Sequence, residues 1–466
     1  MRIQPPKIEI DDSAPYKEAL FDRKAFGESL TTLLRNVEDS LVIFVNAPWG
    51  EGKSTFAQMW RAHLRSEKLN AIYFDAYAAD YVEDPFVCFS GEILSFVERE
   101  LSDMEGVQVP KTEFKKTAIE VGKRMVGLVA KVGIRAATMG AVDATHVAEL
   151  KDIGSDVASG VSDIGSDIIE KKIEHYAAEK DALKAFRRTL GTLAAKVREK
   201  QGFPLTIIVD ELDRCRPDFA LSLLERIKHL FDVEGVAFIL LVNRDQIESY
   251  VRMVYGESVD ARAYLLKFAN IFVDLPVQHP MFHRGQGRQE FVRTLIEHYN
   301  FSEGIHDGGF FSRSISFLFS HFDLTLREIE KTLLVLSIYY GSLPKNELSN
   351  EFLISLLAIL KTKRPWFFDR LRRGGVTADE FFKETGLANF REESGDGVSR
   401  EWVTDMLNYC LMSDEELAKV AGPDAQIGRP TGPARMGSWL VRYSISRQNV
   451  IPFFCRRLEQ FSAAPR

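Results

Sequence analysis

The feature that most constrains the fold is a short apolar run, followed by a glycine turn and then a helical stretch. Residues 40–46 read SLVIFVN, and a nearly continuous apolar run of this length is typical of a strand buried in a parallel sheet. The turn after it contains Gly50 and Gly52, and residues 54–64 have a helical pattern. A strand, a turn and a helix in this order predict an α/β fold.

The alternation of strands and helices continues along the chain. Further strands are predicted at residues 71–74, 205–209, 236–242 and 271–273, and helices at residues 21–37, 85–101 and 220–231. Residues 111–199 are rich in Ala, Gly and charged side chains without a strand pattern, which indicates a helical insertion. From about residue 289 onward helical periodicity dominates. We therefore expect four parts. Two core segments, at residues 1–110 and 200–280, flank a helical insertion at residues 111–199. A helical lid with a C-terminal helical domain follows at residues 281–466.

The composition excludes several classes of protein. The 466 residues have a formal net charge of −7, so the chain as a whole is not a polybasic nucleic-acid binder. The four cysteines form no CxxC pair, which argues against a zinc ribbon and against a disulfide framework. The N-terminal residues lack the apolar segment of a signal peptide, so we expect a cytoplasmic protein.

The glycine turn itself comes close to a phosphate-binding loop. Residues 47–55 read APWGEGKST, which matches the P-loop pattern G-x-x-x-x-G-K-[ST] except that Ala47 replaces the first glycine. An alanine is tolerated there if the position needs no positive φ. Lys53 is expected to reach the β- and γ-phosphates, and the Ser54 hydroxyl to ligate Mg²⁺. The residues expected to surround the nucleotide are Pro48, Trp49, Gly50, Glu51, Gly52, Lys53, Ser54 and Thr55. The alternative is a chance Gly-Lys-Ser in a turn, which the flanking strand and helix disfavour.

Two carboxylates follow the apolar run at residues 205–209. Asp210 and Glu211 stand where that strand ends, and open α/β sheets bind ligands at the carboxyl ends of their strands. We expect Asp210 to bind Mg²⁺ and Glu211 to be the base that orients the attacking water. The alternative is that the pair only caps a helix, and the presence of a P-loop in the same chain disfavours it.

An amide stands at the end of the next strand. Asn243 is expected to hold the attacking water or a γ-phosphate oxygen, and its alternative role is that of an ordinary turn asparagine. Residues 243–246 (NRDQ) resemble a guanine-reading NKxD motif, but Gln246 stands where that motif needs aspartate. Adenine, and therefore ATP, is the expected nucleotide.

These motifs together resemble the KAP family of P-loop NTPases. Residues 49–54 (WGEGKS) are similar to the family's WGSGKS loop. Residues 74–77 (FDAY), followed by Glu83-Asp84-Pro85, resemble its F-N-A-W…D-P stretch, with Tyr77 in place of tryptophan. Residues 210–217 (DELDRCRP) are close to its D-D-L-D-R-C motif.

Later segments add to the resemblance. Residues 264–268 (YLLKF) resemble the family's Y-L-x-K-[IF] helix, and residues 326–330 (LREIE) resemble its R-x-I segment without the usual proline. The resemblance covers about residues 24–371, interrupted by the insertion. It implies a hydrolase of the additional-strand, catalytic-glutamate class: a P-loop NTPase parallel sheet with a helical insertion and a helical C-terminal region.

The resemblance also bears on where such a protein works. KAP proteins are often tied to the inner face of membranes, and some bacterial members are linked to exclusion of phage, which implies a role in antiviral defence. Many carry membrane helices between the P-loop and the acidic motif. At that place residues 125–142 of this chain include Lys131 and Arg135, each of which costs ~2.5–3.5 kcal/mol near a bilayer centre. We expect no transmembrane helix, while peripheral membrane contact stays open.

Phosphoryl transfer often uses an arginine to stabilise developing charge. Arg327 falls in the predicted lid, where a sensor-2 arginine would lie. Arg214 follows the acidic pair and would act across a subunit interface, which implies a homo-oligomer or a protein partner. Each could instead form a surface ion pair, and this is the stronger interpretation for Arg216 and Arg262.

Two basic stretches raise the question of further partners. One side of a helix in the insertion carries Lys116, Lys123, Arg124, Lys131 and Arg135, while its other side carries Ile119, Met125, Val126, Val129 and Val132. Such a helix binds an anionic membrane or a partner, or is simply solvated on its basic side. Residues 361–373 mix bases with Trp366, Phe367 and Phe368, which suits single-stranded nucleic acid, although aromatic residues at this spacing are more often core. We expect His279, His283 and His321 to be structural.

The sequence thus predicts a Mg²⁺-dependent ATPase acting as a mechanochemical or switch component. The first alternative is a nucleotide-gated scaffold with little hydrolysis. The second is a small-molecule kinase, which Asp210, Glu211 and the long helical C-terminal half disfavour.

Overall fold

The computed structural model divides into two compact units. Unit 1 comprises Met1–Glu9, Trp49–Gly52 and Val277–Arg466, and unit 2 comprises Ile10–Pro48 and Lys53–Pro276. His279 and His283 lie outside the described residues, as do positions 139–142 of the stretch at 125–142. The structure describes residues 6, 9–17, 19–82, 84–102, 105–138, 161–276, 286–301, 305, 308–343, 350–390, 398–421 and 445–460.

Unit 2 is built on a parallel sheet of five strands, and all five predicted strands are confirmed. Their order is β2-β3-β4-β1-β5, so β4 lies between β1 and β3. This is the additional strand that the family resemblance implied, inserted between the strand before the P-loop and the strand before the acidic pair. The strands are β1 (Leu41–Asn46), β2 (Ile72–Asp75), β3 (Leu205–Asp210), β4 (Val236–Val242) and β5 (Ile271–Asp274).

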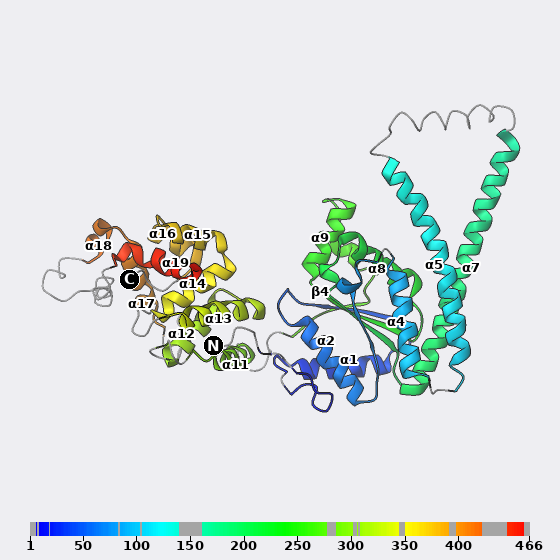
Figure 1. Cartoon of the computed structure of the whole chain (residues 1–466), viewed down its shortest axis with the longest axis horizontal. Coiled ribbons are helices and arrows are strands. Elements are labelled where there is room, and N and C mark those ends of the chain that lie inside the picture. The colour runs from blue at the N-terminus through cyan, green and yellow to red at the C-terminus, as the bar shows by residue number, and fades with distance from the viewer. Residues whose placement is uncertain are drawn as a thin grey trace. The chain divides into compact units, whose positions relative to one another are not determined.

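Helices cover both faces of this sheet because its central strands are apolar on both sides (Figure 1). Successive side chains of β1 point to opposite faces: Val42 and Phe44 enter one core, and Ile43 and Val45 enter the other. The first core includes residues of α4, α8 and α9, and the second includes residues of α1 and α2. The helices are α1 (Arg23–Asn36), α2 (Lys53–Ser66), α3 (Ala76–Ala79), α4 (Pro85–Glu100), α8 (Pro217–Leu230), α9 (Arg244–Tyr255) and α10 (Ala261–Leu265), with the 3₁₀ helix η1 (Leu212–Arg214) after β3.

A group of phenylalanines forms the centre of the first core. The Phe231 side chain is fully buried just after α8, and its ring centroid lies 5.4 Å from that of Phe89 and 5.5 Å from that of Phe186. Phe86 and Phe238 follow at 6.0 and 6.1 Å. Phe231 therefore joins the sheet, α4 and the insertion in one packed cluster.

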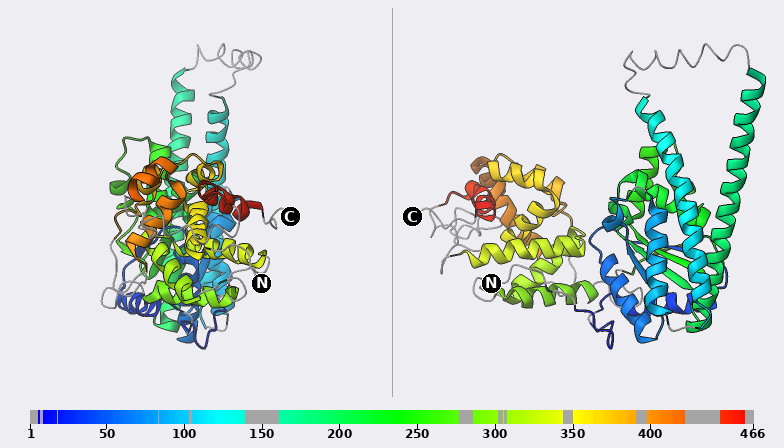
Figure 2. Two further views of the ribbon diagram at one scale, coloured as in Figure 1. Left: turned by 90° about the vertical axis from the view of Figure 1, so that its left-hand side faces the viewer. Right: turned by 45° about the vertical axis from the view of Figure 1, so that its right-hand side comes forward.

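The predicted helical insertion consists of two long helices in the described residues. They are α5 (Gln108–Thr138) and α7 (Val161–Gln201), which pack against each other near the sheet and diverge where they extend beyond it (Figure 2). The Thr117 and Thr189 hydroxyls are hydrogen-bonded at 2.9 Å, and the Phe114 and Phe186 ring centroids are 5.3 Å apart. Within the described residues, none of the helices is both long enough and apolar enough to cross a bilayer.

The expected apolar face of α5 is wrong at Ile119. Its side chain is 49% exposed, whereas Phe114, Ala118 and Val121 are buried. These three follow the spacing of residues that share one helix face, and that face enters the core that α5 shares with α4 and α7. The rest of the predicted apolar side, Met125, Val126, Val129 and Val132, has side chains outside the described part of the structure.

Unit 1 is helical. Helix α14 is its centre, because every side chain from Phe352 to Leu360 is buried. Of the basic and aromatic stretch at 361–373, Phe367 and Phe368 are buried, as the core interpretation expects, and Trp366 is 53% exposed. The helices are α11 (Gln286–Tyr299), α12 (Gly308–His321), α13 (Leu326–Gly341), α14 (Glu351–Lys363), α15 (Pro365–Arg373), α16 (Ala378–Thr385), α17 (Arg400–Leu411), α18 (Asp414–Ala421) and α19 (Val450–Gln460).

Helix α13 begins with a reciprocal capping box, which makes a stability prediction possible. The Thr325 hydroxyl accepts from the Glu328 N–H at 3.3 Å, and the Glu328 carboxylate accepts from the Thr325 N–H at 2.8 Å. Thr325→Ala should therefore lower the free energy of unfolding by about 1 kcal/mol in urea titrations. Thr325→Ser keeps the hydroxyl and should stay close to the wild type; equal losses in both variants would contradict a capping role.

Candidate nucleotide-binding site

The P-loop connects β1 to α2, as the sequence predicts. Gly50 and Gly52 have φ values of 88° and 77°, in the left-handed region that glycine adopts without strain. Ala47 does not have a positive φ, and its N–H donates to the Val242 carbonyl at 3.0 Å. The alanine at the first glycine position is therefore compatible with the loop.

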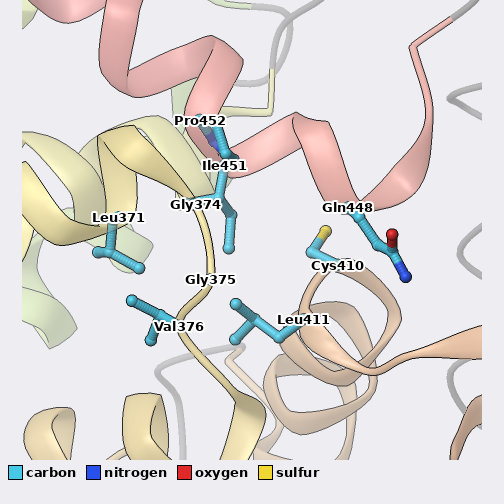
Figure 3. Close-up of a pocket in the computed structure, with 9 residues that line it drawn as sticks. All are labelled: Leu371, Gly374, Gly375, Val376, Cys410, Leu411, Gln448, Ile451 and Pro452. Carbon is cyan, nitrogen blue, oxygen red and sulfur yellow. The ribbon is translucent and has the colours of Figure 1, made fainter.

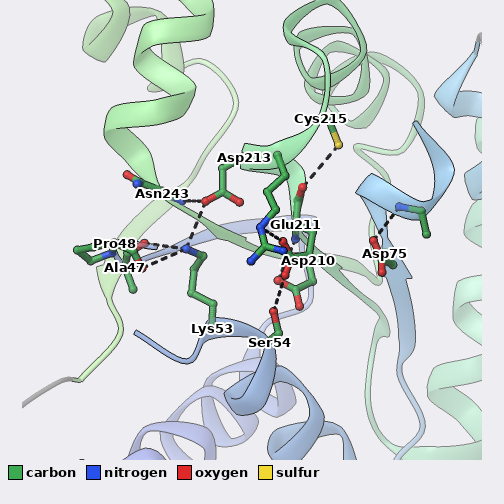
Figure 4. A network of polar contacts seen from close by, with 12 residues as sticks. Ala47, Pro48, Lys53, Ser54, Asp75, Asp210, Glu211, Asp213, Cys215 and Asn243 are labelled. Atoms are coloured by element: carbon green, nitrogen blue, oxygen red, sulfur yellow. Dashed lines mark hydrogen bonds and ion pairs between the residues drawn. The ribbon is translucent and has the colours of Figure 1, made fainter. Parts of the chain in front are cut away.

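The P-loop lysine and serine meet the acidic residues at the carboxyl edge of the sheet (Figure 4). The Ser54 hydroxyl, in the first turn of α2, donates to Glu211 Oε1 at 2.9 Å. Lys53 Nζ lies 3.3 Å from Asp213 Oδ2. Because β4 separates β1 from β3, these contacts join loops that follow two non-adjacent strands.

Asp210 is held by hydrogen bonds at the end of β3. Its Oδ2 accepts from the Tyr73 hydroxyl at 2.9 Å, and its Oδ1 accepts from the Glu211 N–H at 2.9 Å. Burial raises the pKa of the Asp210 carboxyl, although these hydrogen bonds from Tyr73 and Glu211 act in the opposite direction. Tyr73 was missed by the sequence reasoning. The only feature of the sequence that could have indicated Tyr73 is that its strand, β2, ends at the same polar edge of the sheet as β3.

Glu211 adopts an unusual backbone conformation. Its φ of 60° lies in the left-handed region, which is uncommon for a residue with a side chain and is enriched at functional sites. Its carboxylate receives the Ser54 hydroxyl and forms an ion pair with Arg214. Burial also raises the pKa of this carboxyl. Arg214 therefore pairs with Glu211 within its own chain.

Asp213 and Asn243 form a second polar group beside Lys53. The Asn243 N–H donates to Asp213 Oδ2 at 2.8 Å, while the Asn243 side chain makes no capping hydrogen bond to α9. The Tyr250 hydroxyl donates to the Asp213 carbonyl at 2.9 Å. Asp213 belongs to the acidic motif at residues 210–217, but the residue pattern predicts no role for it, because the pattern does not reveal the path of the chain through η1.

Other predicted site residues belong to unit 1. There the Glu51 carboxylate is buried and lies 3.6 Å from Arg288 Nη2, and the Arg327 N–H, in α13, donates to the Gly50 carbonyl at 3.2 Å. Trp49 is 43% exposed. In unit 2, Pro48 is exposed, Thr55 is half-buried, and Arg216 pairs with Asp80 at 3.0 Å, as the ion-pair interpretation expects.

The donor set fits Mg²⁺ in the way that nucleotide sites bind it. Ser54 and Asp210 offer a hydroxyl and a carboxylate, which are the hard oxygen ligands that Mg²⁺ prefers. No cluster of three or more His, Cys, Asp or Glu side chains suited to a metal occurs in the described part of the chain. A site with few protein ligands is what Mg²⁺ needs when substrate phosphates complete its coordination.

Unit 1 contains a cavity of about 190 Å³ between α15, α17 and α19 (Figure 3). Its lining combines the apolar side chains of Leu371, Val376, Leu411 and Ile451 with the Gln448 side chain and the chain at Gly374 and Gly375. Burial raises the pKa of the Cys410 thiol at its wall to about 12, so this thiol is not a reactive nucleophile near neutral pH. The residues that line this cavity include no charged side chain, unlike those at the edge of the sheet.

The chain was compared with protein families, curated proteins and solved structures. A family model described as the KAP family P-loop domain matches residues 23–343. Comparison with curated proteins gave no match. Among solved structures, the ORC2 protein of Aeropyrum pernix matches in its ADPNP–ADP complexes, with 12% identity, a TM-score of 0.32 and coverage of 97% of this chain and 98% of that one. Its ADP form matches with 12% identity, a TM-score of 0.33 and coverage of 94% and 86%. Scores this low carry no argument about the present chain.

Proposed function

The chain belongs to the KAP family of P-loop NTPases, and from this premise we propose that it hydrolyses ATP with Mg²⁺ and acts as a nucleotide-dependent switch. One observation carries the proposal: the hydroxyl of Ser54 and the carboxylate of Glu211 meet at 2.9 Å although their strands are not adjacent. This contact supports a site in which the phosphate loop and the acidic loop act together.

The residues at this edge have complementary roles in the proposed reaction. Lys53 neutralises charge on the phosphate oxygens, and the Asn243 amide orients the water or a γ-phosphate oxygen. The water oxygen bonds to the γ-phosphorus as the bond to the β-phosphate oxygen breaks, and Glu211 accepts the proton of that water. Ser54 and Asp210 would hold Mg²⁺, which when bound neutralises charge on the phosphates.

The test is phosphate release from ATP by the full-length protein. We expect turnover with Mg²⁺ that falls at least about tenfold when EDTA removes the metal, because the site has few protein charges to replace it. Binding of a fluorescent ADP analogue is measured in parallel. Absence of nucleotide binding in the presence of Mg²⁺ would contradict the proposal as a whole.

A nucleotide-gated scaffold with little hydrolysis is the second candidate. It is favoured by the contacts of Glu211, whose carboxylate is engaged by both Ser54 and Arg214. A base held in this way accepts a proton poorly until Arg214 moves. Tight nucleotide binding without turnover in the purified protein, even in a single-turnover experiment, would favour this candidate.

If Arg214 restrains Glu211, a binding partner can activate hydrolysis by separating these two side chains. We propose that a second copy of the chain or another protein draws Arg214 away from Glu211 and so starts hydrolysis. A turnover rate per protein molecule that rises with protein concentration would support a second copy, and stimulation by anionic vesicles or single-stranded nucleic acid would point to those partners instead.

A cytoplasmic role in bacterial defence against phage rests on the family resemblance alone, and plaque counts with and without an intact Lys53 would test it.

A further inference from the structure

This inference rests on the proposed function and concerns how the site regulates nucleotide affinity. We propose that Asp213 competes with the nucleotide phosphates for Lys53. Its carboxylate pairs with the P-loop lysine when no nucleotide is bound, and an incoming phosphate must break this ion pair. Asp213 is thus a positioning residue that keeps nucleotide affinity below what the P-loop alone would provide.

The first support is the set of partners around the lysine. An ammonium group has three N–H donors. Lys53 Nζ is surrounded by three acceptors: the Ala47 carbonyl at 2.9 Å, the Pro48 carbonyl at 3.4 Å and Asp213 Oδ2 at 3.3 Å. No donor is left over for a phosphate oxygen. Nucleotide binding through Lys53 therefore requires that one of these partners is released.

The second support is that the pair is buried. The Lys53 side chain is 8% exposed and the Asp213 side chain 1%. Charges that are shielded from water interact more strongly than surface pairs, and separating them leaves a buried carboxylate without its counter-ion. This cost is subtracted from the attraction between the lysine and the phosphates.

The third support is the difference in mobility between the partners. The Asp213 carboxylate is fixed by the Asn243 N–H at 2.8 Å, and its main-chain carbonyl is fixed by the Tyr250 hydroxyl. Lys53 has a flexible four-carbon side chain. When phosphate arrives, the lysine is the group that moves, and Asp213 stays as a negative charge in place.

The experiment compares nucleotide affinities in a double-mutant cycle. Asp213→Asn keeps the side-chain shape and an oxygen for the Asn243 N–H but removes the charge that holds Lys53. Lys53→Met removes the ammonium group at similar volume. Dissociation constants of a fluorescent ADP analogue are measured with Mg²⁺ for the wild type, both single variants and the double variant. Asp75→Asn is the matched control, because Asp75 ends β2 at the same sheet edge, caps α3 through the Ala78 N–H and forms neither a hydrogen bond nor an ion pair with Lys53.

We expect Asp213→Asn to bind the ADP analogue about tenfold more tightly than the wild type, and less than about threefold more tightly when Lys53 is already methionine. Asp75→Asn should bind like the wild type. A gain in affinity is a result that structural damage does not produce. Unchanged or weaker binding by Asp213→Asn, or an equal gain in both backgrounds, would overturn the proposal.

The cycle also separates this inference from the proposed function. Lys53→Met should weaken binding at least about tenfold. If the wild type fails to bind the analogue, or if Lys53→Met binds as well as the wild type, the proposed nucleotide site itself is wrong. If Asp213→Asn does not fold, as judged by circular dichroism, Asp213→Ser takes its place with the same expected gain.

Discussion

Glu211→Gln will lower ATP turnover about 10²–10³-fold while nucleotide affinity stays near that of the wild type. The glutamine side chain keeps an oxygen that can accept the hydrogen bond from Ser54, but an amide cannot take a proton from water at neutral pH. The loss should therefore lie in the chemical step. Phosphate release at saturating ATP and binding of a fluorescent ADP analogue measure the two quantities separately.

The matched control for this variant is Glu67→Gln. Glu67 follows α2, at the opposite end of that helix from Lys53. Like Glu211, it forms an ion pair with an arginine, here Arg35, and the glutamine substitution removes that pair. Its turnover should stay within about twofold of the wild type, since exposed ion pairs contribute little. A Glu211→Gln enzyme with the wild-type rate would show that Glu211 is not the base.

Phe231→Ala is expected to have the largest effect on stability. Its ring is fully buried and contacts four other phenylalanines, so truncation leaves a cavity between α4, α7 and the sheet. Loss of a large buried aromatic side chain costs about 3–5 kcal/mol in the free energy of unfolding. Urea unfolding followed by circular dichroism and tryptophan fluorescence measures the change.

Tyr81→Ala is the control for that truncation, because the Tyr81 side chain is 86% exposed. Its stability should lie within about 0.5 kcal/mol of the wild type. A loss below about 1 kcal/mol for Phe231→Ala would mean that the phenylalanine cluster rearranges to fill the space.

The strands were predictable because burial on both faces leaves a continuous apolar signature, as in β4 (Val236–Val242). Their order was not readable in the same way. The neighbours of β1 are β4 and β5, both about 190 or more residues later in the sequence, and side-chain periodicity describes only local structure. The additional-strand order came from the resemblance to a family and was confirmed by the pairing.

The candidate site was predictable where a residue directly follows a strand or begins a helix. Lys53, Ser54 and Glu211 lie at the same sheet edge for that reason. Residues whose position depends on the path of a turn were not predictable: Asp213 reaches Lys53 only because η1 folds the chain back after β3. The role of Arg214 across a subunit interface stays a prediction, although in this chain the side chain pairs with Glu211.

The strand order has a consequence for synthesis of the protein on the ribosome. β1 pairs only with β4 and β5, and β2 only with β3, among the strands of the described residues. Translation proceeds at about 5–20 residues per second, so β1 waits roughly 10–40 s for β4 to emerge. During that interval the nascent chain carries the apolar segment LVIFV without a partner strand, and unpaired apolar strands are prone to aggregate. We therefore expect the yield of folded protein to depend on chaperone capacity during translation.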